Sequence, residues 1–357
     1  MSVKKIFVEE FIELSGKYPV LDVRSPGEYL HAHIPNAYSF PLFTDEERKV
    51  VGTLYKQESR ERAIKKGLEY FGVRMVKMVE DAEVIIKNED KIVLIHCWRG
   101  GMRSAGVAWL LDLYGFKVYT LTGGYKTFRQ WVLAQFKNEY QFKIIGGYTG
   151  SGKTEVLAAM QKKTMAVIDL EGLANHKGSA FGGINMPVQP SQEMFENKLA
   201  VELFSLQKGY LSDTSQGSQT IYLEDESQRI GLVNIPLEMW KQMRSKSLLF
   251  LQIPFEERLK FISEHYGKGE KEKLVNAIMR IKKKLGGLET KTSINFLLEN
   301  NITEAFRILL FYYDKMYKKG LQNRAGWEAL CTEIEHNTVD PITIANKIIQ
   351  HETTTNV

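Results

Sequence analysis

The chain has 357 residues, of which 43% are hydrophobic and 25% are charged, and its formal net charge is +5 at pH 7. This length predicts two domains, and the composition excludes a disordered chain. No apolar run approaches the ~20 residues of a membrane span and the N-terminal residues contain no signal-peptide core, so we expect a cytoplasmic protein that does not enter a membrane.

The first part of the chain alternates short apolar runs with longer amphipathic segments. Residues 19–23, 91–96 and 117–121 have the apolar, β-branched character of buried strands. Residues 104–113 have helical periodicity, and Gly115 is the expected stop signal. This alternation predicts a parallel sheet with helices on both faces.

Cys97 directly follows the predicted strand at residues 91–96, at the carboxyl end of a strand, where open parallel sheets bind ligands. Glycines in the next residues let backbone N–H groups point inward, and the helix that follows adds partial positive charge. Such a loop suits a tetrahedral oxyanion beside a nucleophilic thiolate. The candidate catalytic residues are Cys97, Arg99 and Arg103. The rest of the anion-binding loop comprises Trp98, Gly100, Gly101, Met102 and Ser104.

Two chemistries share a loop of this kind. A cysteine phosphatase forms a phosphocysteine and needs a general acid, whereas a rhodanese-type transferase uses the cysteine to carry sulfur or selenium. Residues 22–29 (DVRSPGEY) and 31–37 (HAHIPNA) resemble the rhodanese pattern DVRxxxEYxxGHIPGA, with alanine and asparagine in place of its two glycines. We expect Asp22 and Arg24 to hold the architecture. Cys331, the other cysteine, forms no CxxC pair with Cys97, which argues against a zinc site or a disulfide framework.

A second series of apolar runs begins after residue 140. Strands are expected at residues 142–146, 165–169, 220–224 and 248–252. Helical segments separate them, and the last hundred residues are expected to be mostly helical. These patterns predict a second parallel α/β domain with a helical C-terminal region.

Residues 147–154 (GYTGSGKT) match the phosphate-binding pattern GxxxxGK[ST], between a predicted strand and a predicted helix as this P-loop motif requires. Its glycines free backbone N–H groups to wrap phosphates, Lys153 neutralises them, and Thr154 would reach a magnesium ion. The loop predicts a diphosphate ligand and leaves the rest of that ligand open. The candidate diphosphate-binding residues are Gly147, Thr149, Gly150, Ser151, Gly152, Lys153 and Thr154.

We therefore expect an α/β protein with two domains. A rhodanese-like α/β domain with the cysteine loop is predicted over residues 1–138. A P-loop NTPase-like parallel α/β domain with a helical C-terminal extension is predicted over residues 139–357.

Acidic residues end two of the predicted strands in the second domain. Glu224 and Asp225 occupy a Walker-B-like position, and Asp169 and Glu171 form another acidic pair. Either pair could hold a metal-bound water or activate a substrate, although acidic strand ends are also common by chance. His176 lies in a glycine-punctuated segment that we expect to form a mobile loop over the site. These five residues are candidates for a second site, and none is assigned as a metal ligand.

Residues 268–284 carry seven basic residues against two acidic ones. A patch of this kind can follow a nucleic-acid backbone, but a solvated helix face is the more common explanation.

The motifs are more specific in combination, and together they resemble the tRNA 2-selenouridine synthase family. The resemblance is carried by the cysteine loop, the P-loop, and residues 121–126 (LTGGYK), 169–179 (DLEGLANHKGS), 224–227 (EDES) before Ile230-Gly231, and 51–57 (VGTLYKQ). It covers roughly residues 15–320.

The resemblance implies a tRNA-modifying transferase that converts 2-thiouridine at the wobble position to 2-selenouridine in two steps. The sulfur is first geranylated from geranyl diphosphate, whose diphosphate suits the P-loop, and selenium from selenophosphate then displaces the S-geranyl group. In the family the rhodanese cysteine carries selenium as a selanylcysteine, which here is Cys97, so the loop around it would bind selenophosphate. No tightly bound cofactor is implied, and Mg²⁺ is allowed. The implied partner is tRNA with a wobble 2-thiouridine, and the enzyme that makes selenophosphate is a further candidate partner.

Two alternatives remain open. One is a rhodanese-type sulfurtransferase or cysteine phosphatase fused to a kinase-like domain. The other is a non-catalytic, nucleotide-gated RNA-binding module with a vestigial rhodanese domain, against which the intact Cys97 argues.

Overall fold

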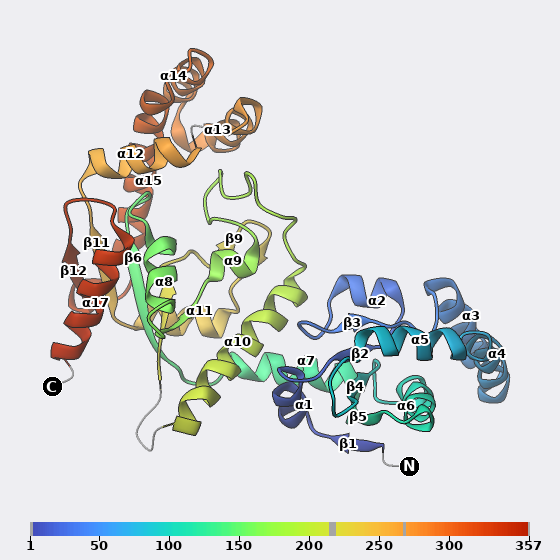
Figure 1. Cartoon of the computed structure of the whole chain (residues 1–357). Coiled ribbons are helices and arrows are strands. Elements are labelled where there is room, and N and C mark those ends of the chain that lie inside the picture. Colours follow the sequence, from blue (N-terminus) through green and yellow to red (C-terminus); the bar gives the residue numbers. More distant parts are fainter. Residues whose placement is uncertain (1–2, 214–218, 267–268, 356–357) are drawn as a thin grey trace. The chain divides into compact units, whose positions relative to one another are not determined.

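The computed structural model describes residues 3–213, 219–266 and 269–355 (Figure 1). The chain divides into two compact units, one comprising Met1–Gln135 and Glu193–Val201 and the other comprising Phe136–Gln192 and Glu202–Val357. Each unit contains one five-stranded parallel sheet, so the predicted α/β class is confirmed. None of the described helices has both the length and the apolar character needed to cross a membrane.

The sheet of the first unit has the strand order β1-β5-β4-β2-β3, and every neighbouring pair is parallel. Its strands are β1 (Lys4–Ile6), β2 (Val20–Asp22), β3 (Tyr38–Ser39), β4 (Ile92–His96) and β5 (Lys117–Leu121). The three predicted strands are confirmed. The two edge strands, β1 and β3, are short and largely exposed, and for this reason they carry no apolar pattern that the sequence could reveal.

Helices cover both faces of this sheet, as predicted. Helices α5 (Met75–Ile85) and α6 (Met102–Tyr114) pack on the face that carries Val93 and Ile95 of β4. Helices α1 (Val8–Ser15) and α7 (Gly124–Gln135) lie on the other face, where Phe11 and Tyr125 contact the ring of His96. Because side chains alternate along a strand, Cys97 falls on the α6 face, just past the carboxyl end of β4. Helices α2 (Pro26–His31), α3 (Asp45–Gln57) and α4 (Arg60–Gly72) occupy the connection between β2 and α5.

The sheet of the second unit has the order β12-β11-β6-β8-β7, again with parallel neighbours. Its strands are β6 (Gln141–Gly147), β7 (Ala166–Ile168), β8 (Thr220–Glu224), β11 (Leu248–Gln252) and β12 (Cys331–Glu335), and a separate two-stranded antiparallel ribbon joins β9 (Arg229–Ile230) to β10 (Val233–Asn234). The four predicted strands are confirmed, and β12 is an addition. It is an edge strand that buries only Ile334, so its sequence CTEIE lacks a clear strand signal.

Two groups of helices complete the second unit (Figure 1). Helices α8 (Lys153–Gln161) and α17 (Pro341–Thr355) share one core with β6, β8, β11 and β12. The predicted helical region comprises α12 (Phe255–Tyr266), α13 (Lys271–Leu285), α14 (Gly287–Leu298) and α15 (Ile302–Gln322), which pack around a core of their own. The remaining helices are α9 (Leu170–Ala174), α10 (Gln192–Asp213), α11 (Leu237–Ser245) and α16 (Trp327–Leu330).

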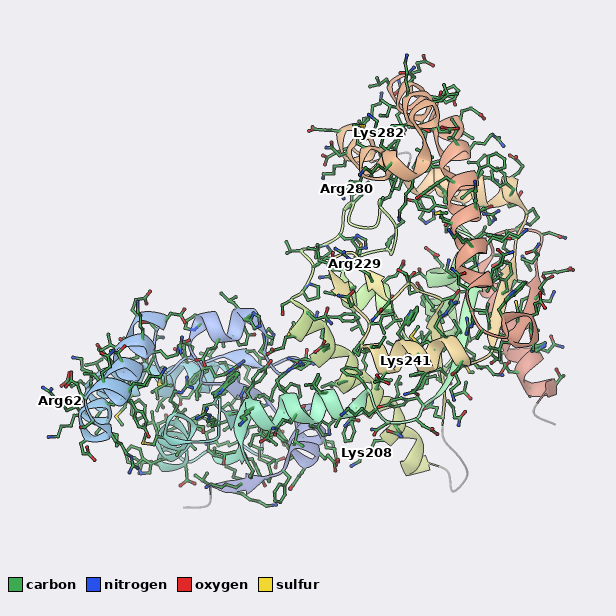
Figure 2. All side chains as sticks on the ribbon, turned by 180° about the vertical axis from the view of Figure 1, so that it is seen from behind. Arg62, Lys208, Arg229, Lys241, Arg280 and Lys282 are labelled. Carbon is green, nitrogen blue, oxygen red and sulfur yellow. The ribbon has the colours of Figure 1, made fainter. Side chains whose placement is uncertain are left out.

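Helix α13 contains most of the predicted basic segment. It buries Leu274, Ala277 and Ile278 in the helical core and exposes its lysines and arginine on the opposite side. Arg280 and Lys282 illustrate this exposed face in Figure 2. Lys268 lies outside the described residues.

Candidate functional site

The cysteine loop lies between β4 and α6, as predicted. Cys97 is buried, with 3% of its surface exposed, and its Sγ lies 3.2 Å from Oγ of Ser104 in the first turn of α6. The helix begins at Met102, so the loop approaches the positive end of the helix. The structure therefore brings Cys97 and Ser104 together, with the amide groups of the loop beside the sulfur.

The electrostatic environment favours the Cys97 thiolate. Burial alone would raise the pKa of this thiol. Hydrogen bonds from the Ser104 hydroxyl and from the N–H groups of Ser104 and Arg99, together with the charge of Arg103, outweigh that effect and lower the pKa of Cys97. Burial raises the pKa of Cys331, the other thiol, with a smaller contribution from Glu333. The pKa values of the two thiols are therefore shifted in opposite directions from the ordinary value.

This contrast predicts different pH profiles for alkylation of the two thiols. Iodoacetamide reacts with the thiolate, so the rate at Cys97 should reach half its maximum at a lower pH than the rate at Cys331. Ser104→Ala removes a stabilising hydroxyl and should move the Cys97 midpoint to higher pH, whereas Ser245→Ala in the second unit should not. Peptide mass spectrometry of native protein alkylated across a pH series measures both sites, and coincident profiles would contradict the assignment.

The turn after β5 is hydrogen-bonded to the backbone of the cysteine loop. The N–H groups of Tyr125 and Lys126 donate to the carbonyl oxygens of Cys97 and Trp98, at 2.8 and 3.0 Å. Gly124 has a φ of +64°, and a Cβ at this position would lie 2.4 Å from the Cys97 carbonyl oxygen. Only glycine fits there, which gives a physical reason for the LTGGYK motif.

Asp22 and Arg24 form a buried ion pair at 2.6 Å, as expected for residues that hold the architecture. The Arg24 guanidinium lies 3.8 Å from the centre of the Tyr125 ring and donates to the carbonyl oxygen of Ala32 at 2.7 Å. The pair thus links the segment that resembles rhodanese to the helix behind the cysteine loop. Breaking a buried pair of this kind by removing one partner typically costs about 3–5 kcal/mol.

The two candidate arginines of the loop are placed differently. Arg103 donates to Glu28 Oε2 at 2.9 Å, whereas Arg99 is exposed beside Trp98. Glu28 lies in the predicted rhodanese segment but was not among the candidate site residues. His96 precedes Cys97 and is fully buried, and this burial lowers the pKa of His96 to about 4, so the ring is neutral at neutral pH.

The P-loop of the second unit connects β6 to α8. Gly152 has a φ of +74° directly before the first helical residue, Lys153. Nζ of Lys153 donates to the Gly147 carbonyl oxygen at 3.1 Å, and Ser151 is buried inside the turn, where its hydroxyl donates to the carbonyl oxygen of Tyr148. The predicted strand–loop–helix context of the motif is thus present.

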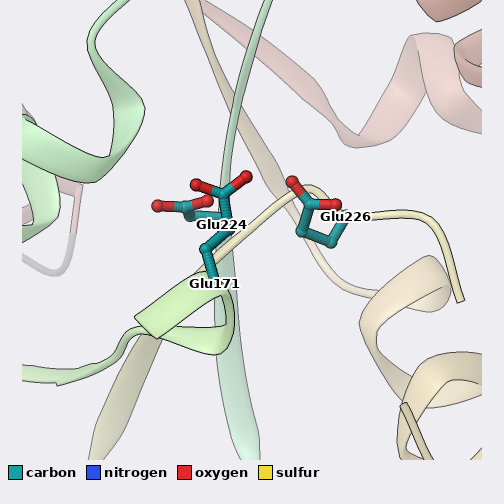
Figure 3. Close-up of side chains that lie close together, drawn as sticks. All are labelled: Glu171, Glu224 and Glu226. Carbon is teal, nitrogen blue, oxygen red and sulfur yellow. The ribbon is translucent and has the colours of Figure 1, made fainter. Parts of the chain in front are cut away.

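Three carboxylates lie beside this loop, and Figure 3 shows that they are close together. Glu171 lies on α9, Glu224 ends β8, and Glu226 follows it, and one oxygen of each lies within 4.8 Å of the others. The Thr154 hydroxyl donates to Glu171 Oε2 at 3.2 Å. Glu224 is 1% exposed, and neither of its carboxylate oxygens has a hydrogen-bond partner among the described residues.

Burial and mutual repulsion hold these carboxyl groups in the protonated state. Burial raises the pKa of Glu171 to about 8, with the charge of Glu226 as the next contribution. Burial and the charge of Glu224 likewise raise the pKa of Glu226 to about 8. The pKa of Glu224 is also well above its ordinary value, through burial and the charge of Glu171.

The structure separates each of the two predicted acidic pairs. Asp169 is exposed and caps α9 by accepting from the Gly172 N–H at 2.7 Å. Asp225 accepts from the Tyr317 hydroxyl at 2.7 Å and pairs with Arg324. Glu226 joins the site instead. Its signal was present in the sequence, because residues 224 and 226 of an extended segment point to one side and residue 225 to the other.

A cavity of about 600 Å³ adjoins the P-loop and the three carboxylates. One wall is apolar and comes from α12 and α15, with Phe261, Ile262, Tyr313 and Met316. Residues 177–179 of the glycine-punctuated segment also line it. His176 does not, and burial lowers the pKa of its ring, with a further contribution from Arg280.

Comparisons with known proteins agree with this two-unit organisation. Residues 7–130 match a family described as a rhodanese-like domain, and residues 140–340 match one described as the tRNA 2-selenouridine synthase AAA domain. Proteins named tRNA 2-selenouridine synthase from Nitrosomonas europaea, Sulfurovum sp. and Hydrogenovibrio crunogenus are 32%, 33% and 35% identical, over 86% of this chain and 90% of theirs. A crystal structure of the N-terminal domain of an ATP/GTP-binding protein from Clostridium difficile is 41% identical, covers 37% of this chain and 99% of its own, and has a TM-score of 0.35.

Proposed function

The chain belongs to the tRNA 2-selenouridine synthase family of enzymes, and on this premise we propose that it converts wobble 2-thiouridine to 2-selenouridine by geranylation at the P-loop site followed by selenation at Cys97. The observation that carries the proposal is the presence in one chain of an anion loop around a thiol of lowered pKa and a P-loop beside an apolar wall. The first suits selenophosphate, and the second suits an isoprenoid diphosphate.

In the first step the 2-thio sulfur forms a bond to C1 of the geranyl group. The C1–O bond breaks, and its electron pair leaves with the diphosphate. The base loses its N3 proton to solvent as the C2=S double bond becomes a single bond. The P-loop amides and Lys153 are placed to stabilise this leaving group, because developing negative charge is favoured by fixed donors and a nearby cation. The apolar residues of α12 and α15 offer a surface for the hydrocarbon chain.

In the second step the C2–S bond of the geranylated base breaks, a C2–Se bond forms, and the geranyl thiol leaves. Selenium has the oxidation level of selenide both in selenophosphate and in the selenouridine product. Hydrolysis of the P–Se bond of selenophosphate releases phosphate and leaves selenide. Selenium bound to Cys97 is two electrons more oxidised than selenide, so the carrier is first oxidised by a low-molecular-weight disulfide. The Cys97 thiolate attacks one sulfur of this disulfide, which forms a mixed disulfide and releases one thiol, and selenide then displaces the second thiol to give Cys97–S–Se⁻. This selenium attacks C2, and the thiol then attacks Cys97 Sγ, which frees the selenouridine and restores the mixed disulfide.

The lining of the cavity at Cys97 supports selenium transfer over phosphate ester hydrolysis. Among the described residues that line it, none is an aspartate, a glutamate or a histidine that could protonate a leaving group. His96 is buried and neutral, and Glu28 is held by Arg103. The lowered pKa of Cys97 in turn argues against a vestigial rhodanese domain.

The three carboxylates near the P-loop fit a divalent cation such as Mg²⁺. Both oxygens of buried Glu224 lack a hydrogen-bond partner among the described residues, and a Thr154 hydroxyl lies beside Glu171. Carboxylate and hydroxyl oxygens are the donors that Mg²⁺ takes, and when bound it would neutralise charge on the diphosphate. Glu171, Glu224, Glu226 and Thr154 are the residues that would hold it.

The raised pKa values predict how pH and Mg²⁺ affect stability. Between its unfolded pKa, near 4.5, and its folded pKa, about 8, Glu171 holds a proton in the folded protein that the unfolded chain releases. Its stabilising contribution is therefore present at low pH and is lost as the pH rises through 8. The Tm of metal-free protein should fall from pH 6 to pH 9, and Mg²⁺ should raise it more at pH 8.5 than at pH 6.

Differential scanning fluorimetry measures this effect. Glu224→Gln should reduce the Mg²⁺-dependent rise in Tm, whereas Glu335→Gln on the exposed edge strand β12 should leave it intact. A Mg²⁺ response that does not depend on pH, or that survives in Glu224→Gln, would argue against a cation at the three carboxylates.

The exposed basic face of α13 supports tRNA as the macromolecular substrate, because a row of lysines and arginines can follow a phosphate backbone. We place the reaction in the cytoplasm, where tRNA and low-molecular-weight thiols are both present. The enzyme that makes selenophosphate is a natural partner for direct delivery of this donor.

The proposal is tested with purified protein and an anticodon stem-loop RNA that contains 2-thiouridine, in the presence of a low-molecular-weight thiol and its disulfide. Mass spectrometry of the nucleosides should show S-geranyl-2-thiouridine with geranyl diphosphate alone, and 2-selenouridine when selenophosphate is also present. Hydrolysis of phosphate esters and sulfur transfer from thiosulfate to cyanide, assayed in parallel, test the alternatives. Absence of both modified nucleosides would overturn the proposal.

A further inference from the structure

A cavity of about 780 Å³ opens beside Cys97 within the first unit. Its walls come from the cysteine loop, the first turns of α6, and the helices α3 and α4. The side chains that matter for its character are Val51, Tyr55, Leu68, Met102 and Trp109, all of them apolar or aromatic. Cys97 itself lines this cavity, but the steps derived above give no role to the apolar walls.

Several side chains of the apolar walls are exposed. Leu68, Tyr55 and Met102 are 59%, 55% and 56% exposed, and they lie around one cavity. Helix α3 has 13 residues and none of them is fully buried. Val51 packs partly against the core of the unit, whereas Tyr55 is exposed, and both residues line the cavity. Exposed apolar side chains that gather around one cavity mark binding sites.

Basic side chains accompany this apolar surface. Arg48, Lys56, Arg99 and Arg103 line the cavity, and the described lining contains no acidic residue. Arg48 and Arg103 share Glu28, whereas Lys56 and Arg99 are exposed. The cavity thus combines an apolar interior, several cations and a reactive sulfur, which complements an anionic molecule with a hydrocarbon chain attached near its reacting atom.

We propose that this cavity binds the geranyl chain of the S-geranylated wobble nucleotide during selenation, with C2 of the base at Cys97 and the flanking phosphates near Lys56 and Arg99. This inference rests on the proposed function, because the S-geranyl nucleotide is the product of its first step. The geranyl group is attached through sulfur to C2, the atom that selenium attacks. A chain buried beside Cys97 therefore directs the reacting carbon to the sulfur that carries selenium. The geranyl group thus has two roles in the first unit: it positions C2 of the base, and it then leaves as part of the geranyl thiol.

If the cavity buries the S-alkyl group, kcat/KM for selenation should depend on the length of that alkyl chain. Each methylene that enters an apolar site strengthens binding by about fourfold, so an S-methyl nucleotide should react with a kcat/KM at least about a hundredfold below that of the S-geranyl nucleotide. Both substrates lose an alkyl thiol of similar leaving ability, so the chemical step itself should contribute little to the difference.

The experiment measures selenation of synthetic stem-loop RNAs that carry S-geranyl- or S-methyl-2-thiouridine, with selenophosphate, a low-molecular-weight thiol with its disulfide, and full-length protein. Leu68→Ser removes part of the apolar wall and should lower kcat/KM for the S-geranyl RNA about tenfold while leaving the S-methyl RNA unaffected. Leu113→Ser is the matched control, because Leu113 is 60% exposed on α6 and does not line the cavity. Loading of Cys97 with radioactive selenium should be unchanged in both variants, which shows that the loop is intact.

The outcomes separate this inference from the proposed function. If the wild-type protein selenates neither RNA, the proposed function fails. If it selenates both RNAs with the same kcat/KM, or if Leu68→Ser lowers both equally, the proposed function stands and the geranyl site is wrong. If Leu68→Ser leaves selenation intact but changes the sedimentation coefficient of the protein, the apolar face is instead an interface between copies of the chain, and the inference is overturned.

Discussion

The Cys97→Ser variant is expected to stop at S-geranyl-2-thiouridine. Serine is nearly isosteric with cysteine, but its hydroxyl neither ionises near neutral pH nor carries selenium. The rate of selenation should therefore fall by at least about a thousandfold, which is the usual loss of rate when an enzyme loses its catalytic nucleophile. Geranylation should proceed at the wild-type rate, because its residues lie in the other unit. Nucleoside mass spectrometry after incubation with both donors should therefore show accumulation of the geranylated base.

Cys331→Ser provides the matched control for this variant. Cys331 is the only other cysteine of the chain, it is partly buried at the start of β12, and burial raises the pKa of its thiol. It should be selenated poorly and should be dispensable for 2-selenouridine formation. Wild-type selenation in Cys97→Ser, or a loss of selenation in Cys331→Ser alone, would show that the carrier was assigned to the wrong sulfur.

Lys153→Ala should produce the opposite defect. Removing the only lysine of the P-loop motif takes away the cation nearest to the proposed diphosphate leaving group, so geranylation should fall by about a hundred- to a thousandfold. When stem-loop RNA that already carries S-geranyl-2-thiouridine is supplied, the same variant should convert it to 2-selenouridine at the wild-type rate. Wild-type selenation of the pre-geranylated RNA would show that the lost activity is geranylation and that the variant is correctly folded.

Lys162→Ala is the corresponding control, since Lys162 is an exposed lysine at the other end of α8. It should geranylate normally. If Lys153→Ala geranylates 2-thiouridine RNA as fast as the wild-type protein, the P-loop has another role and the first step belongs elsewhere in the chain.

The sequence was sufficient for those parts of the fold that have strong local signals. Buried strands such as β4 and β8 carry continuous apolar runs, and the left-handed Gly115 ends α6 where the pattern places it. The edge strand β7 is buried along its whole length and was predicted, whereas the edge strand β12 buries only Ile334 and was missed because it carries no such signal. The contribution of Glu193–Val201 to the first unit was missed as well, since it depends on contacts between segments distant in sequence.

The candidate sites show the same division between local and non-local information. The cysteine loop and the P-loop are each formed by consecutive residues, so their motifs located them directly. The acidic site combines α9 with the end of β8, and the sequence could not show that Asp169 caps a helix or that Asp225 is held by Tyr317 and Arg324. Glu28 and the apolar cavity depend on how separate helices pack, which no motif records.

Helix α3 has a consequence for the dynamics of the first unit. It begins with a capping box at Thr44 and packs against α4, and Val51 contacts the core of the unit, but none of its side chains is fully buried. Segments with few fully buried side chains open locally more readily than the core of a domain. An occupant of the adjacent cavity would add contacts to Tyr55 on the exposed side of this helix and so oppose its local opening. The order of this helix would then depend on substrate.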